Sequence, residues 1–127
     1  LQMLFESSEE SPEEKGLGLL KGRVVRFNGA PFCGPNALKI PQIGWNSMTF
    51  PELRSSLFTG VGEGSHLYFV HSYHARPDED SDVLAWSDYG ARFCAAAGRR
   101  NVTGVQFHPE KSQAIGLNIL NNFGKLS

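Results

Sequence analysis

Apolar residues along the 127-residue chain gather in short runs that glycine and proline separate, a pattern that predicts several short strands. The strongest run covers residues 67–73 and is apolar or aromatic almost throughout, as in a buried strand. Further strands are predicted over residues 22–27, 83–89, 92–97 and 102–107. Residues 83–89 and 92–97 are expected to form a hairpin around Gly90. Residues 40–46 are expected to be extended, with interruptions at Pro41 and Gly44.

Helical spacing of apolar side chains is found near both ends of the chain. Residues 112–123 predict an amphipathic helix, with Ser112 as its N-cap and Gly124 as its C-terminal stop. Leu1, Leu4 and Phe5 also fit helical spacing, and the acidic residues 7–15 that follow predict an exposed helix end and a loop. Strands with a helix at each end indicate the α/β fold class.

Composition and charge narrow the function. Apolar residues make up 40% of the chain and charged residues 20%, enough for a packed core. A formal net charge of -1 argues against a dedicated nucleic-acid binder, and no apolar run is long enough for a membrane span. The two cysteines, Cys33 and Cys94, are too few and too far apart for a disulfide scaffold or a cysteine-based zinc site. Free thiols in the cytoplasm are the simplest interpretation.

The segment with the clearest chemistry is residues 104–112, GVQFHPEKS. His108 follows a predicted strand, and Glu110 follows two residues later. A histidine can act as a general base while a carboxylate orients its ring, provided that Pro109 bends the chain enough to bring the two together. From these residues alone, a structural role for His108 is the more common outcome, so both interpretations stay open.

This segment resembles the His-Pro-Glu motif of class I, or triad, glutamine amidotransferases. Within that superfamily, residues 41–46 (PQIGWN), 68–73 (YFVHSY) and 1–10 (LQMLFESSEE) are similar to the glutaminase subunits of imidazole glycerol phosphate synthase. The resemblance extends over nearly the whole chain. It implies a mixed sheet flanked by helices. It also implies hydrolysis of L-glutamine to glutamate and ammonia, which passes to a cyclase (synthase) subunit for histidine biosynthesis.

The resemblance also implies roles for individual residues. His108 would transfer protons and Glu110 would orient it, without a cofactor or a metal. The substrate-binding residues would be Gln2, Ser72 and Tyr73. The residues facing the barrel-shaped cyclase subunit of a heterodimer would be Trp45, Asn46 and Lys111. His71 and His74, next to Ser72 and Tyr73 in the sequence, are expected to be structural. Arg99 and Arg100 are expected to lie in a solvated turn.

The family's nucleophile is a cysteine in a G-x-C-x-G-x-Q elbow, and Leu1-Gln2 matches the end of that motif. We therefore expect residues 1–127 to be a partial amidotransferase domain that lacks the N-terminal strands and the elbow, and the chain alone to be inactive. Neither Cys33 nor Cys94 lies in an elbow sequence.

A catalytically dead module that retains only partner docking is the alternative. An amidotransferase of the anthranilate or GMP synthase type is disfavoured by the GWN and YFVHSY segments.

Overall fold

The computed structural model describes residues 4–5, 7–8, 18, 20–35, 37–51, 55–99 and 102–125. The eight strands among these residues form two sheets. The smaller sheet has the order β1 (Ser7–Ser8), β2 (Gly22–Arg26), β5 (Tyr73–Pro77). The larger has the order β4 (His66–His71), β3 (Gln42–Thr49), β6 (Val83–Asp88), β7 (Arg92–Arg99), β8 (Val102–Val105). Among the described strands only β1 and β2 pair in parallel, so the strands are mixed in direction, as the resemblance implied.

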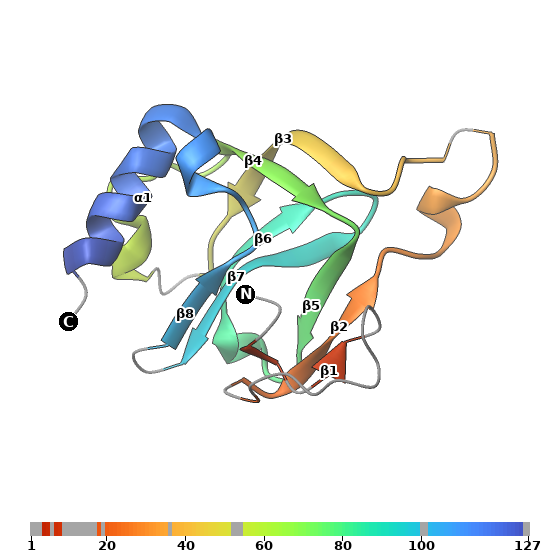
Figure 1. Cartoon of the computed structure of the whole chain (residues 1–127), viewed down its shortest axis with the longest axis horizontal. Coiled ribbons are helices and arrows are strands. Elements are labelled where there is room, and N and C mark those ends of the chain that lie inside the picture. The colour runs from red at the N-terminus through yellow and green to blue at the C-terminus, as the bar shows by residue number, and fades with distance from the viewer. Residues whose placement is uncertain are drawn as a thin grey trace.

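The helical elements lie mainly at one end of the larger sheet. Helix α1 spans Gln113–Lys125, and the short 3-10 turns are η2 (Ala30–Phe32), η3 (Ser56–Phe58), η4 (Asp80–Asp82) and η5 (Pro109–Lys111). Figure 1 shows α1 beside η3 at one end of the molecule and the smaller sheet at the other, with the curled larger sheet between them. Among the described residues, none of the helices has the length and apolar character needed to cross a membrane.

The core divides into two clusters that follow the two sheets. The larger cluster lies between the larger sheet, η3 and α1, and is rich in aromatic rings packed edge to face, such as Phe69 against Phe93 and Phe107. The smaller cluster joins β2 and β5 to β6 and β7 and includes Phe5 and Cys94, both buried. Burial of these apolar side chains is the main force that holds the two sheets together.

The predicted strand over residues 67–73 is in fact two strands in different sheets. The β3–β4 pairing ends at Gln42 opposite His71, and the β2–β5 pairing begins with Arg26 opposite Tyr73. Ser72 lies at the change, where its carbonyl accepts a hydrogen bond from the Phe27 N–H at 3.1 Å. An apolar run does not show this change of partner, because the second sheet exists only after folding.

Other elements also differ from the sequence-based expectation. β3 continues through Gly44 to Thr49, since Gly44 pairs across to Phe69 and the ladder is not broken. β8 is shorter than predicted and only half-buried, because β7 is the one described strand that pairs with it. Ser7 and Ser8 pair with β2 as a strand, where an exposed helix end was expected.

The ends of α1 also differ from the prediction. Gly124 lies inside the helix, which continues to Lys125, and does not stop it. The Ser112 carbonyl accepts the hydrogen bond of the Gly116 N–H at 3.2 Å, as an N-cap residue's carbonyl does. The Ser112 hydroxyl, however, bonds to other segments of the chain, His108 and Tyr68, and so does not cap the helix.

Candidate active site

The loop after β8 places His108 beside strand β4. The His108 N–H donates to the Tyr68 carbonyl at 2.9 Å. Pro109 then starts the 3-10 turn η5, which folds the chain back so that Nδ1 of His108 lies 2.7 Å from Oε1 of Glu110. The bend required at Pro109 is therefore present, and two residues that would point apart on an extended strand are in contact.

The hydrogen bond to Glu110 decides which ring nitrogen of His108 can react. A carboxylate only accepts, so Nδ1 carries the hydrogen, and in the neutral ring the lone pair is on Nε2, away from Glu110. The pKa of the Glu110 carboxyl is lowered, first by its own backbone N–H and then by the hydrogen bond from His108. The His108 side chain is 39% exposed, so Nε2 can be reached by a reactant. The pair has the arrangement of a general base and its orienting carboxylate.

Ser112 fixes this turn against β4. Its hydroxyl donates to the His108 carbonyl at 2.7 Å and accepts from the Tyr68 N–H at 3.0 Å, and the residue is 1% exposed. Both backbone groups of Tyr68 are thus bonded to the segment that carries His108. Sequence reasoning assigned Ser112 to helix capping and missed this role, which depends on a contact across 44 residues.

Gly116 supports the same turn from the helix side. A Cβ atom at this position would lie 1.8 Å from the Pro109 carbonyl oxygen. Only glycine therefore allows α1 to approach the backbone of η5 as closely as it does. The sequence contains a signal for this contact, a glycine in a helix interior, which usually has a packing reason.

The proposed substrate residues Ser72 and Tyr73 lie where the chain passes from β4 to β5. The Ser72 carbonyl accepts from Phe27, as described above, and the Tyr73 carbonyl accepts from Nδ1 of His71 at 2.8 Å. The Tyr73 side chain packs against the smaller core cluster. Gln2, the third such residue, lies outside the described residues. The substrate-binding roles of all three residues remain predictions.

His71 is held inside the fold, as a structural histidine would be. Besides its bond to Tyr73, its Nε2 lies 2.7 Å from Oε1 of Gln42. The pKa of His71 is lowered to about 4, mainly by burial and to a smaller extent by repulsion from His74 and His108, against the opposing effect of the hydrogen bond to the Tyr73 carbonyl. His71 therefore lies near the His108 site and is uncharged at neutral pH.

Two of the residues proposed to face a partner, Trp45 on β3 and Lys111 in η5, lie near Tyr68 on the exposed face of β3 and β4. Trp45 is 48% exposed, and its ring meets the edge of Tyr68 with the ring centres 5.9 Å apart. Nζ of Lys111 lies 5.8 Å from the centre of the Tyr68 ring. Ile43 and Val70, which pair across the two strands, are also exposed. We call Ile43, Trp45, Tyr68, Val70 and Lys111 the β3–β4 patch.

Asn46, the third residue proposed to face a partner, does not belong to the β3–β4 patch. Its Nδ2 donates to the Asp88 carbonyl at 2.5 Å, and its Oδ1 accepts from the Ser47 N–H at 2.9 Å. Both ends of the amide therefore already form hydrogen bonds within the chain. Asn46 ties β3 to the end of β6, and a contact with a partner remains a prediction.

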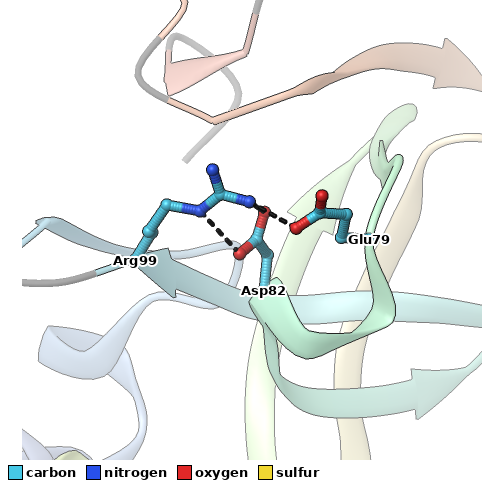
Figure 2. A network of polar contacts seen from close by, with 3 residues as sticks. All are labelled: Glu79, Asp82 and Arg99. Atoms are coloured by element: carbon cyan, nitrogen blue, oxygen red, sulfur yellow. Dashed lines mark hydrogen bonds and ion pairs between the residues drawn. The ribbon is translucent and has the colours of Figure 1, made fainter.

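Arg99 was expected in a solvated turn, and this expectation is wrong. Arg99 ends strand β7, and its guanidinium donates two hydrogen bonds to the buried carboxylate of Asp82, at 3.1 and 3.0 Å, and one to Glu79 at 2.5 Å (Figure 2). This fork of charge-assisted bonds ties β7 to the η4 turn, which explains why Arg99 is ordered at a strand end. Arg100 lies outside the described residues.

Neither cysteine has the setting of a nucleophile. Cys94 is buried on β7, its thiol donates to the Ala96 carbonyl at 3.3 Å, and burial raises the pKa of the thiol to about 12. Cys33 is exposed in the loop after η2, without the strand and helix that form an elbow. Among the described residues, no group of three or more His, Cys, Asp or Glu side chains is placed to hold a metal ion.

Comparison with known proteins identifies the family to which this chain belongs. The family model for glutamine amidotransferase class-I matches residues 2–125, and the chain belongs to that family. The similar proteins include imidazole glycerol phosphate synthase subunit HisH of Syntrophotalea carbinolica, 48% identical over 99% of this chain and 61% of its own length. The subunit of the same name from Geobacillus thermodenitrificans is 51% identical over 97% of this chain and 56% of its own length. The chain thus spans about three fifths of the length of these curated relatives.

Proposed function

We propose that the chain carries the acid–base part of a glutaminase site and belongs to the glutamine amidotransferase subunit of an imidazole glycerol phosphate synthase. The observation that carries this proposal is the 2.7 Å contact between His108 and Glu110, with Nε2 of His108 directed away from the carboxylate. The names of the relatives and their similarity to almost the whole chain support the choice of synthase.

In the proposed reaction a cysteine thiolate attacks the carboxamide carbon of glutamine. Nε2–H of protonated His108 gives its proton to the departing nitrogen, and ammonia leaves as a thioester forms. Neutral His108 then takes a proton from water, and the resulting hydroxide attacks the thioester to release glutamate and the thiolate. Glu110 stabilises the imidazolium at both stages. Because Cys33 and Cys94 are unsuited, we place the nucleophile in the part of the relatives that this chain does not contain.

We further propose that Ser72 and Tyr73, with Gln2, hold the glutamine substrate. The position of Ser72 and Tyr73 supports this role, since they directly follow strand β4, whose Tyr68 carbonyl accepts the hydrogen bond of the His108 N–H.

The partner that we propose is the cyclase subunit, docked on the β3–β4 patch. A half-exposed tryptophan beside a tyrosine is typical of the anchors of a protein interface, and Lys111 adds a positive charge over the tyrosine ring. The backbone of Tyr68, at the centre of the patch, also holds the His108 segment. Docking there would cover the site and give ammonia a short route to the partner. Free thiols at Cys33 and Cys94 agree with a cytoplasmic location for this pathway.

The test measures glutamine hydrolysis by the complete protein in the presence of the cyclase subunit. We expect Glu110→Gln to lower turnover by about two orders of magnitude, because the ring of His108 loses its orienting charge. Asp78→Asn, which makes the same chemical change at an exposed position after β5, is the control and should leave turnover unchanged. Equal turnover of Glu110→Gln and Asp78→Asn would refute the assignment. A complete protein that binds the cyclase subunit but never hydrolyses glutamine would favour the docking module.

A further inference from the structure

A buried chain of hydrogen bonds connects three strands at the point where the backbone changes sheet. Gln42 begins β3, His71 ends β4 and Tyr73 begins β5. Nε2 of His71 lies 2.7 Å from the side-chain oxygen of Gln42, and Nδ1 lies 2.8 Å from the Tyr73 carbonyl. Gln42 is 3% exposed and His71 is 7% exposed, so water does not compete for these bonds.

The hydrogen positions in this chain follow from what each group can donate. The Tyr73 carbonyl can only accept, so Nδ1 of His71 must carry a hydrogen. A neutral imidazole has one N–H, so Nε2 then needs a donor. A half-turn of the Gln42 amide brings its NH2 group to the position of Oε1, and the NH2 group donates to Nε2. With Oε1 toward Nε2, His71 would have to be an imidazolium.

The surroundings of His71 favour the neutral form. The rings of Phe27, Phe69 and Phe93 pack around it, with ring centres 5.1 to 5.7 Å away. The titratable groups that act on it are His74 on β5 and His108 before η5, both of which repel a positive charge, and the pKa of His71 is lowered to about 4. No carboxylate among the described residues forms an ion pair with His71.

We propose that Gln42 is a positioning residue for the glutaminase site: its amide donates to Nε2 of His71 and so completes the hydrogen bonds of that ring in its uncharged Nδ1–H form. In this form His71 fixes the Tyr73 carbonyl at the start of the substrate segment. It also keeps a second positive charge away from His108, which has to be protonated during the release of ammonia. The catalytic part of this inference rests on the proposed function, whereas the hydrogen-bond arrangement does not.

The first experiment follows the imidazole nitrogens of the complete protein by ¹H–¹⁵N NMR between pH 8 and 4.5. We expect His71 to remain the neutral Nδ1–H form down to about pH 5, the range set by its lowered pKa. In Gln42→Glu the carboxylate can only accept, so His71 should carry both hydrogens at pH 7. Gln42→Met has similar length but no acceptor charge, and its His71 should stay neutral.

Two results of the NMR experiment would contradict the proposed hydrogen-bond arrangement around His71. A wild-type His71 that is charged at pH 7, or that has its hydrogen on Nε2, overturns the proposal even if neither variant folds. A Gln42→Glu chain that folds with His71 still neutral also overturns it, because Gln42 would then not control the charge of the ring.

The second experiment measures glutamine hydrolysis by the complete protein with Gln42→Glu. We expect kcat/KM for glutamine to fall by about tenfold or more and its pH profile to change, because positioning and charge are both disturbed. Unchanged kcat/KM and an unchanged pH profile, with His71 charged, would refute the positioning role. An inactive wild-type protein would instead refute the proposed function, while the NMR result would still decide the hydrogen-bond arrangement.

Discussion

Replacement of Gly116 by alanine should separate helix α1 from the turn that carries His108 and Glu110. The new Cβ would lie 1.8 Å from the Pro109 carbonyl oxygen, whereas Cβ atoms in proteins essentially never approach closer than 3.0 Å. The helix and the turn must therefore move apart by at least 1.2 Å, the difference between these two distances. Neither the new Cβ nor the Pro109 carbonyl oxygen can rotate out of the way, because both are attached directly to the backbone. We therefore expect the free energy of unfolding to fall by about 2–3 kcal/mol, the upper part of the range for overpacking.

The assay is urea unfolding of the wild type, Gly116→Ala and Gly124→Ala. Gly124 lies in the same helix, but a Cβ added there would meet no atom within 4 Å, so alanine at this position should raise the free energy of unfolding by up to about 1 kcal/mol. In the complete protein, a displacement of about 1 Å at His108 should also lower glutamine turnover by about two orders of magnitude. If Gly116→Ala is as stable as Gly124→Ala, the packing of η5 against α1 is not as described.

Two further predictions concern residues around the site. Burial lowers the pKa of His71 from its ordinary value of 6.5 to about 4, so the unfolded chain binds a proton at this residue before the folded chain does as the pH falls. The contribution of the neutral His71 to the free energy of unfolding is therefore complete above pH 6.5 and is lost as the pH falls toward 4. The free energy of unfolding should fall by about 2.5 kcal/mol between pH 7.5 and 4.5 because of this residue. Urea unfolding of His71→Asn, which lacks this titration, should show a correspondingly weaker pH dependence. The same pH dependence in the wild type and His71→Asn would contradict the burial of a neutral His71. Ser112→Ala should lower the free energy of unfolding by about 1–3 kcal/mol, because the partly buried backbone groups of Tyr68 and His108 lose their shared partner. A loss below about 0.5 kcal/mol in the same assay would contradict that role.

The sequence predicted local features of this molecule better than contacts between distant segments. Strands β2, β6 and β7 lie close to the predicted ranges, because alternation of apolar residues and glycine turns acts over a few residues. The bend at Pro109 was also predictable, since proline ends a strand ladder and starts a turn. The change of sheet at Ser72 was not, because it depends on which strands His71 and Tyr73 pair with after folding.

The same distinction holds for the site. His108 and Glu110 are two residues apart and could be identified from the sequence, although their catalytic roles remain predictions. The positions of Ser112 against Tyr68 and of Gln42 against His71 join residues 44 and 29 positions apart. Nothing in a single sequence specifies such pairs. Arg99 was placed in a turn for the same reason, since its partners Asp82 and Glu79 are distant in the chain.

The central claim is that His108 serves the glutaminase reaction and not the fold. It is tested most directly with His108→Ala in the complete protein and its cyclase subunit, by measuring synthesis first with glutamine and then with added ammonia. We predict that glutamine-dependent synthesis is abolished, because no group remains to protonate the departing nitrogen, while ammonia-dependent synthesis by the partner survives. Loss of both activities would show that His108 is structural, and survival of the glutamine-dependent activity would show that it is not the acid–base group.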